Sequence, residues 1–335
     1  MIGPLGEPTF YFIGVTTAGS LSLKLFPKWL EELGWPPAAI RGWDIEVRGP
    51  REKYREIVQH IKDDPLALGG LVTTHKIDIV EHAGDLFEFL DPYARIFGEI
   101  SSISKRPGTR GDAARGEDAR GEDALHGHAK DPITAGRALE SFLPSGYWVD
   151  HPQAQAFIMG AGGSGIALSA YLMRPEHGAD VPARILISNR STQGLEHCRE
   201  VHRQVGVRTE VDYLQVGGET TNDQVLARLP AGSLVVNATG MGKDSPGSPL
   251  GDRAVFPQGG YAWEFNYRGS LEFLHQAEDQ AASRGLVVED GVTYFVYGWA
   301  LVMEEVFSRP LEPPRLKALC RVTHEFLGRP DQACE

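Results

Sequence analysis

The chain has 335 residues, which exceeds one average domain and suggests two domains of roughly 150 residues each. Hydrophobic residues make up 41% and charged residues 23%, which is the composition of an ordinary globular protein with a sizeable core. The net charge of −12 argues against nucleic acid as the main partner, and an anionic ligand would need local positive charge to bind.

The sequence contains no signal for export or for membrane insertion. The first 15 residues have no basic region, and no segment approaches the roughly 18 consecutive apolar residues of a spanning helix. The three cysteines, Cys198, Cys320 and Cys334, are far apart and lack the spacing of metal ligands, which fits a reducing compartment. We therefore expect a cytoplasmic protein with no membrane partner, no bound metal and no disulfide framework.

Short apolar runs alternate with amphipathic stretches along the chain, which indicates an α/β fold. In the first part, we expect strands at residues 11–15, 44–47 and 68–72, and helices at 21–33, 51–61 and 86–97. The first helix is predicted to end at Gly34, just before two prolines.

Residues 106–123 interrupt this alternation. They contain the tandem repeat Ala-Arg-Gly-Glu-Asp at 114–118 and 119–123, and they have almost no apolar side chains. Such a stretch cannot bury enough surface to offset its ordering entropy. We interpret it as a flexible insertion without a function, placed between strands at 100–105 and 125–129.

The second part of the chain has the regular alternation of a doubly wound sheet. Pro132 fits the first turn of a helix that runs to about residue 143, and a polar junction follows up to residue 153. Strands are expected at 156–159, 184–188, 209–213, 233–237 and 261–265, and helices at 294–307 and 314–327. Strands that alternate with helices predict a parallel sheet. The expected domains are 1–150, 151–285 and a helical segment, 286–335.

A glycine-rich segment between an apolar strand and an apolar helix matches the pattern G-x-G-x-x-G. Its residues are Gly160, Ala161, Gly162, Gly163, Ser164 and Gly165. Glycines permit a tight turn and a close backbone approach, and the N-terminus of the following helix offers N–H groups to a pyrophosphate. We therefore expect a dinucleotide here; the alternative is a purely structural turn.

The end of the next expected strand indicates which dinucleotide binds. An NAD site usually places Asp or Glu there for the ribose 2′-hydroxyl. This strand ends instead in Asn189-Arg190-Ser191-Thr192. An arginine with neighbouring hydroxyls can bind a 2′-phosphate, so NADP is favoured over NAD. The alternative is a solvated Arg190, with Ser191 or Thr192 capping the next helix.

A third polar turn, Asn237-Ala238-Thr239-Gly240, follows another expected strand. Ligands bind at the carboxyl ends of strands in such sheets. We expect Ala238 and Thr239 to contact the nicotinamide half of the cofactor, although turns of this composition are common.

Lys76 follows an expected strand of the first domain, in the segment Val72-Thr73-Thr74-His75-Lys76. An alcohol that is oxidised must lose a proton as well as a hydride, and a lysine of depressed pKa can take that proton. Taken alone, Lys76 is better explained as a surface residue that starts a helix. Asp131, which precedes Pro132, is likewise first interpreted as a helix N-cap.

In this order, these segments resemble the shikimate/quinate dehydrogenase family over nearly the whole chain. The resemblance implies that Ser20 and Ser22 hold a substrate carboxylate, that Lys76 is the catalytic lysine, and that Asp131 pairs with it. Tyr267, in a segment similar to D-x-x-Y, would grip the anionic end with the two serines. Further positions implied for the site are Thr73 and Ser101 on the substrate side and Gly291 on the cofactor side.

The resemblance also implies an architecture. The first domain would bind substrate, the second would be a Rossmann-type NADP-binding domain, and the C-terminal helices would pack back on the first domain. The cleft between the domains would house the chemistry and close on binding. A homodimer is compatible with this layout, because dimers are the commonest assembly of soluble enzymes.

Several positions depart from the family pattern. The segment that ends at Lys76 is one residue shorter and has no proline, and Leu23 follows Ser22 in place of a proline. Ser101, Ala129 and Gly298 stand where the family has amide side chains. Because an unpaired buried hydroxyl costs about 1–3 kcal/mol, losing three amides would weaken the binding of shikimate itself. The reaction class is therefore better supported than the substrate.

The sequence thus predicts an NADP-dependent oxidoreductase that acts on a secondary alcohol of a small, anionic cyclic hydroxy acid. One rival has the same architecture but a different substrate, such as a quinate-like or amino-substituted ring. A second rival is a homologue that binds dinucleotide without turnover, as a ligand sensor or an inert protein. The missing amides favour this second rival, and the presence of both Lys76 and Asp131 argues against it.

Overall fold

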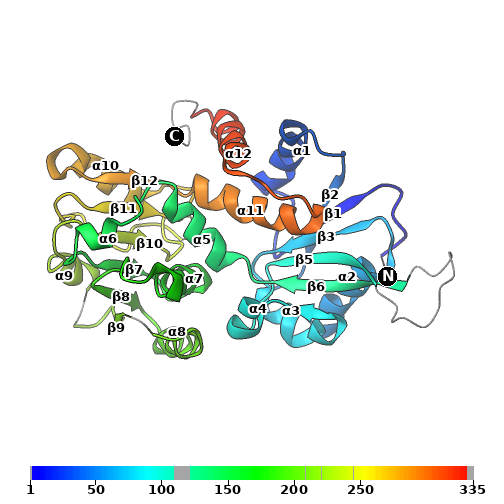
Figure 1. Ribbon diagram of the computed structural model, residues 1–335, viewed down its shortest axis with the longest axis horizontal. Coiled ribbons are helices and arrows are strands. Elements are labelled where there is room, and N and C mark those ends of the chain that lie inside the picture. Colours follow the sequence, from blue (N-terminus) through cyan, green and yellow to red (C-terminus); the bar gives the residue numbers. More distant parts are fainter. Residues whose placement is uncertain (1, 109–120, 208, 220, 244, 330–335) are drawn as a thin grey trace. The chain divides into compact units, whose positions relative to one another are not determined.

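A computed structural model of the chain describes residues 2–108, 121–207, 209–219, 221–243 and 245–329 (Figure 1). The chain divides into two compact units: Met1–Lys130 together with Gly298–Glu335, and Asp131–Tyr297. These divisions fall after 130 and 297, whereas the sequence interpretation placed boundaries after 150 and 285. Within the described residues, no helix has the length and apolar character needed to cross a membrane.

The first unit contains a mixed six-stranded sheet in the order β2-β1-β3-β5-β6-β4. Its strands are β1 (Thr9–Gly14), β2 (Ala39–Asp44), β3 (Ala67–Val72), β4 (Phe89–Leu90), β5 (Ser102–Gly108) and β6 (Gly121–His128). Strands β1, β2 and β3 are parallel, and β5 is antiparallel to both of its neighbours. The carboxyl ends of β1, β2 and β3 therefore lie at one edge of the sheet.

Helices cover both faces of this sheet (Figure 1). They are α1 (Leu21–Leu33), α2 (Arg51–Asp63), α3 (Lys76–Ala83), α4 (Pro92–Phe97), residues 298–307 of α11 (Val292–Phe307) and α12 (Pro313–Phe326). Tyr11 and Ile13 pack in one core with α2 and α3. On the other face, the rings of Phe10 and Phe12 lie 5.8 and 5.2 Å from that of Trp299 in α11. Alternate residues of β1 thus face opposite cores, as the period of a strand requires.

Helix α12 and residues 298–307 of α11 belong to the first unit, so the C-terminal helices pack largely on that unit, as predicted. Trp29 of α1 donates a 3.0 Å hydrogen bond from its indole Nε1 to Thr323 Oγ1 of α12. Arg321 of α12 forms an ion pair with Glu32 of α1. Helix α12 is therefore fixed against α1 by both buried and surface contacts.

Three predictions for the first unit were wrong. The second strand is Ala39–Asp44, not 44–47. The helix expected at 86–97 is a 3₁₀ turn (Gly84–Leu86), strand β4 and the short helix α4. Pro92 cannot lie inside a helix without removing a hydrogen bond, and Asp91 caps α4 by accepting one from Ala94 N.

The third correction concerns the stretch at 106–123. Strands β5 and β6 extend into it, because Arg106 pairs with Ala124 and Gly108 with Gly121 in an antiparallel ladder. Ladder hydrogen bonds join backbone groups and need no apolar side chains. The remainder of the expected flexible insertion, 109–120, lies outside the described residues.

The second unit contains a parallel six-stranded sheet in the order β12-β11-β10-β7-β8-β9. Its strands are β7 (Ala156–Met159), β8 (Arg184–Asn189), β9 (Glu210–Gln215), β10 (Leu234–Asn237), β11 (Tyr261–Glu264) and β12 (Val287–Glu289). This is the strand order of the Rossmann fold, with its topological switch point between β7 and β10. The predicted doubly wound sheet is confirmed, and β12 was not anticipated.

The helices of the second unit lie on both sides of this sheet (Figure 1). They are α5 (Asp131–Glu140), α6 (Tyr147–Asp150), α7 (Gly163–Leu172), a 3₁₀ turn (Pro175–His177), α8 (Thr192–Val205), α9 (Asn222–Leu226), α10 (Glu272–Arg284) and residues 292–297 of α11. Helix α5 packs closely on α7: a Cβ atom at Gly136 would lie 2.1 Å from the ring of Tyr171. This packing explains why residues 131–150 belong to the second unit.

Candidate functional site

The glycine loop lies at the switch point, between the end of β7 and the start of α7. Gly160 has φ +109°, and a Cβ atom there would lie 2.6 Å from the Ala238 carbonyl oxygen. A Cβ atom at Gly165 would lie 2.0 Å from the Gly160 carbonyl oxygen. Both positions therefore require glycine.

The start of α7 fits a pyrophosphate. No side chain caps this helix at Gly162, and a Cβ atom at that position would meet nothing within 4 Å. The first N–H groups of a helix have no partner within the helix and favour an anion. The loop thus combines open space with uncapped donors, which is what a dinucleotide phosphate needs.

At the end of β8, the three expected residues have different environments: Ser191 and Asn189 form local hydrogen bonds, and Arg190 is exposed. Ser191 caps α8 by accepting a 3.4 Å hydrogen bond from Gly194 N, as the alternative interpretation held. Asn189 Nδ2 donates to the Ser191 carbonyl oxygen at 3.1 Å. The Arg190 side chain is exposed, and no ion pair holds it among the described residues. Its guanidinium is therefore available to an anionic ligand.

The turn after β10 lies beside the glycine loop. Ala238 N donates a 2.8 Å hydrogen bond to the Met159 carbonyl oxygen at the end of β7. Thr239 is exposed, and both its N–H and its hydroxyl donate to Asn237 Oδ1, at 3.1 and 2.7 Å. The expected cofactor contacts on β7 and β10 are thus brought together.

Gly291 and Tyr267 lie near the start of α11. A Cβ atom at Gly291 would lie 2.4 Å from the Phe265 carbonyl oxygen and 2.6 Å from that of Asn266, so this position also requires glycine. The Tyr267 ring stacks on the Phe295 ring with a centroid distance of 4.1 Å. Gly291 therefore allows close backbone packing beside the segment that carries Tyr267.

In the first unit, two serines meet at the N-terminus of α1. Ser20 is the N-cap, and its hydroxyl accepts from Ser22 N at 3.3 Å and donates to Ser22 Oγ at 3.2 Å. The positive end of a helix dipole favours an anion at this point. Two hydroxyls at a helix N-terminus can bind a carboxylate.

Thr73 lies at the same edge of the sheet. It follows β3, and its N–H donates to the Ile13 carbonyl oxygen at 3.0 Å. A Cβ atom at Gly14, the last residue of β1, would lie 2.9 Å from Thr73 Cγ2. The ends of β1 and β3 therefore bring Thr73 to the edge from which the chain continues to Ser20.

Ser101 is more constrained than the sequence suggested. It is only 3% exposed, and its hydroxyl donates to the His128 carbonyl oxygen at 3.3 Å and accepts from Lys130 N at 2.8 Å. A hydroxyl has one donor and two acceptor sites. Ser101 therefore fixes the backbone just before Asp131 and uses two of its three hydrogen-bonding positions to do so.

Lys76 begins α3, at a start that a buried histidine secures. His75 is 1% exposed; its Nε2 lies 2.7 Å from the Ile45 carbonyl oxygen and its Nδ1 lies 3.0 Å from Asp78 Oδ2. Lys76 O accepts from Ile100 N at 2.9 Å. His75 was not predicted from the sequence to have a role, although it stands next to the candidate lysine. Lys76 lies in the first unit, whereas Asp131 begins both α5 and the second unit.

A charged cluster surrounds the residue before Asp131, and it was not anticipated from the sequence. Glu305 of α11 pairs with Lys130 and with Arg106, whose Nη2 lies 2.9 Å from Glu305 Oε2. His128 Nε2 lies 3.6 Å from the same oxygen, and burial lowers the His128 pKa to about 4. His128 is therefore neutral at pH 7, and the Glu305 carboxylate forms its ion pairs with Lys130 and Arg106.

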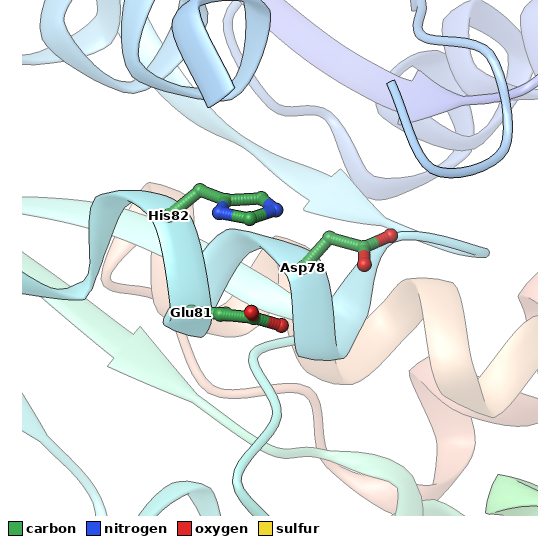
Figure 2. Close-up of side chains that lie close together, drawn as sticks. All are labelled: Asp78, Glu81 and His82. Carbon is green, nitrogen blue, oxygen red and sulfur yellow. The ribbon is translucent and has the colours of Figure 1, made fainter. Parts of the chain in front are cut away.

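Asp78, Glu81 and His82 form a possible metal-binding group on α3 (Figure 2). One ligand atom from each lies within 4.8 Å of the others. Residues at positions i, i+3 and i+4 of a helix lie on the same face, whatever their side chains. Proximity of these three residues therefore does not by itself indicate a metal site. Asp78 Oδ2 already contacts His75 Nδ1 and, at 3.3 Å, the Tyr54 hydroxyl. We therefore assign no metal to this group.

Similarity to known proteins is low at the level of sequence. No protein-family model matches the chain. The chain is 22% identical over 244 residues to "Shikimate dehydrogenase (NADP(+))" of Lactococcus lactis subsp. cremoris, a match that covers 72% of each chain.

Solved structures share the fold over almost the whole chain. The chorismate mutase/shikimate 5-dehydrogenase fusion protein of Clostridium acetobutylicum has a TM-score of 0.67 at 18% identity, over 97% of this chain and 100% of that one. Shikimate 5-dehydrogenase of Thermus thermophilus, in complex with shikimate, has 0.65 at 21%, over 96% and 99%. Quinate dehydrogenase of Corynebacterium glutamicum, in complex with NAD, has 0.67 at 19%, over 96% and 99%. The chain therefore shares the fold of these shikimate and quinate dehydrogenases.

Proposed function

We propose that the protein is an NADP-dependent oxidoreductase that interconverts a secondary alcohol and a ketone on a small cyclic hydroxy acid. The observation that carries this proposal is the Rossmann strand order, with an uncapped glycine loop and the Ala238–Thr239 turn side by side at its switch point. The names of the curated relative and of the quinate dehydrogenase support the reaction class.

The dinucleotide is proposed to bind across the carboxyl ends of three strands, with a different part of it at each end. The loop after β7 would take the pyrophosphate, the turn after β8 the adenosine ribose, and the turn after β10 the nicotinamide half. The residues are Gly160, Ala161, Gly162, Gly163, Ser164, Gly165, Asn189, Arg190, Ser191, Ala238, Thr239 and Gly291. The bound nicotinamide would accept or supply the hydride.

Arg190 is proposed to select NADP over NAD. No carboxylate follows β8 to bind a ribose 2′-hydroxyl, and Arg190 is exposed. A guanidinium can form paired hydrogen bonds with a 2′-phosphate. The curated relative is named for NADP, and related structures were solved with NADP(H) as well as with NAD. NADP is therefore the preferred cofactor in this proposal.

The substrate is proposed to bind by its carboxylate to Ser20 and Ser22, with Tyr267 as a third contact. Thr73 would contact a ring hydroxyl, and Ser101 would offer its remaining lone pair. Lys76 would exchange the proton of the reacting hydroxyl, and Asp131 would hold the ammonium in place. A proton acceptor at that oxygen is required because hydride loss leaves a carbonyl only when the hydroxyl proton also departs.

An absorbance assay tests this proposal. Reduction of NADP and of NAD would be followed with shikimate, quinate and amino-substituted cyclic acids. We expect turnover with at least one of these acids and a lower KM for NADP than for NAD. A flat trace with every acid, despite tight cofactor binding, would contradict the proposed activity and favour a binding protein without turnover.

A further inference from the structure

A carboxylate is buried at the carboxyl ends of β10 and β11, beside the turn proposed to contact nicotinamide. Glu264 is fully buried, as is Asn237, and Asn266 is only 3% exposed. A buried charge is costly unless hydrogen bonds satisfy it. The partners of Glu264 therefore indicate what it stabilises.

Three donors converge on this carboxylate. Glu264 Oε1 accepts from Asn266 N at 2.8 Å and from Asn266 Nδ2 at 2.7 Å. Glu264 Oε2 accepts from Asn237 Nδ2 at 2.8 Å. Burial raises the Glu264 pKa to about 7, although these bonds and the charge of Lys243 oppose the shift.

The side-chain amides of Asn237 and Asn266 also form hydrogen bonds with the turn after β10. The Met241 carbonyl oxygen accepts from Asn237 Nδ2 at 3.2 Å and from Asn266 Nδ2 at 3.0 Å. Asn237 Oδ1 accepts from both the N–H and the hydroxyl of Thr239, and Thr239 Oγ1 accepts from Met241 N at 3.1 Å. Each end of the Thr239–Met241 turn is therefore tied to an amide that Glu264 orients.

The orientation of both amides is fixed by their other bonds. If the Asn237 amide rotated by half a turn, its nitrogen would face the two donors of Thr239. If the Asn266 amide rotated, its oxygen would face the Met241 carbonyl oxygen. The position between the amides thus requires a group that only accepts hydrogen bonds, and a carboxylate meets that requirement.

We propose that Glu264 is a positioning residue for the cofactor, which holds the Ala238–Met241 turn through Asn237 and Asn266 in the conformation that binds the nicotinamide half. This inference rests on the proposed function only in taking a nicotinamide dinucleotide as the ligand. Glu264 does not touch the ligand; it acts through the two amides. A change at Glu264 should therefore alter cofactor affinity more than substrate affinity.

The main test is Glu264→Gln, measured by fluorescence titration with NADPH. Glutamine places an N–H₂ group against donors, so one bond of the network is lost and the turn relaxes. We expect the Kd for NADPH to rise about tenfold, as the loss of one charge-assisted hydrogen bond predicts. The KM for NADP should rise with it, whereas the KM for the cyclic acid should stay unchanged.

Asn266→Ala is the second variant, in case Glu264→Gln folds poorly. It removes one tie to the turn but leaves the Asn237 bond to Glu264 in place. We expect a rise in the NADPH Kd of similar size. Tyr213→Phe is the matched control, because it removes a 2.8 Å hydrogen bond to the buried His202 in the same unit, away from the turn. It should lower thermal stability and leave the Kd unchanged.

A pH series distinguishes positioning from general support of the fold. A protonated Glu264 would add a fourth hydrogen where three donors already meet, so affinity for NADPH should fall as pH decreases through about 7. Glu264→Gln should lack that part of the dependence, and comparison at each pH cancels the titration of the ligand itself. The charge of Lys243 lowers the Glu264 pKa, so Lys243→Gln should move the transition to higher pH.

Two outcomes overturn the inference in different ways. If the wild-type protein binds NADPH and both Glu264→Gln and Asn266→Ala bind it equally well, positioning by Glu264 is wrong and the proposed function stands. If the wild-type protein binds neither NADPH nor NADH, both the proposed function and this inference fail.

Discussion

Arg190 is the residue proposed to determine the choice between NADP and NAD. Its guanidinium is exposed at the end of β8 and has no ion pair among the described residues. Arg190→Gln should raise the KM for NADP about tenfold, which corresponds to the loss of a charge-assisted phosphate contact, and leave the KM for NAD unchanged. Steady-state kinetics with both cofactors measure this difference.

The control for this prediction is Arg203→Gln, which removes a guanidinium from the surface of α8 that pairs with Glu200. It should change neither KM. An equal rise for NADP and NAD in Arg190→Gln would mean that Arg190 binds a part of the dinucleotide common to both.

Burial of His202 predicts that the second unit loses stability in acid. Its Nε2 lies 2.8 Å from Ser169 Oγ and its Nδ1 lies 2.8 Å from the Tyr213 hydroxyl, so it links α7, α8 and β9. Burial lowers the His202 pKa from 6.5 to about 4. Between pH 4 and 6.5, His202 binds a proton more readily in the unfolded chain than in the folded protein. The free energy of unfolding should therefore fall by on the order of 3 kcal/mol as pH decreases from 6.5 to 4.

Urea unfolding at several pH values tests this prediction. His202→Gln places a polar amide near the position of Nε2 but cannot titrate, so its stability should depend less on pH in that range. His197→Gln, an exposed histidine of the same helix, is the control and should unfold with the wild-type pH dependence. An unchanged pH dependence in His202→Gln would show that His202 is not the group responsible. Buried His128, whose pKa is also lowered to about 4, should account for part of the remaining dependence.

At the scale of elements, α11 and α12 contribute strongly to the core of the first unit. Trp299 of α11 is 4% exposed, and its ring lies within 5.2–5.8 Å of those of Phe10, Phe12 and Trp29. Trp299→Ala should lower the free energy of unfolding by about 3–5 kcal/mol, because it removes a large buried ring and leaves a cavity.

Chemical denaturation measures this loss. Phe326→Ala, on the partly exposed end of α12, is the comparison and should cost far less. If the two variants lost similar stability, the packing of α11 on the sheet would not be a main source of stability.

Local patterns predicted the elements whose structure is determined by neighbouring residues. The helix at Leu21–Leu33 was predicted with its true ends, because the glycine at 34 adopts the left-handed conformation that ends it. Strand β7 and the glycine loop were also predicted correctly, since an apolar strand, a tight turn and an apolar helix follow one another directly.

Elements that depend on distant partners were not predictable in this way. Strand β4 has two residues and exists because it pairs with β6, which lies more than 30 residues later. Asn237 and Glu264 are likewise 27 residues apart, and only the parallel pairing of β10 with β11 brings them together. Ser101 was predicted as a ligand contact, yet most of its hydrogen-bonding capacity is used by the β6 segment, which sequence spacing cannot reveal.

At the scale of the whole molecule, the proposed function combines two units with different tasks. The second unit carries the residues proposed to bind the cofactor, and the first carries Lys76, Ser20 and Ser22, which are proposed to act on the substrate. With a net charge of −12, the protein needs local positive groups for an anionic substrate and cofactor, and these are proposed to be Lys76, Arg190 and the starts of α1 and α7. Proton exchange and cofactor binding should therefore respond to different substitutions.

Lys76→Ala tests this account most directly, with turnover and NADPH affinity measured on the same preparation. If Lys76 exchanges the proton of the reacting hydroxyl, kcat should fall by about 10²-fold or more while the Kd for NADPH stays within about twofold of wild type. Lys53→Ala, which removes a surface ion pair with Glu46, should change neither quantity. Full turnover in Lys76→Ala, or a parallel loss of turnover and cofactor affinity, would contradict the role proposed for Lys76.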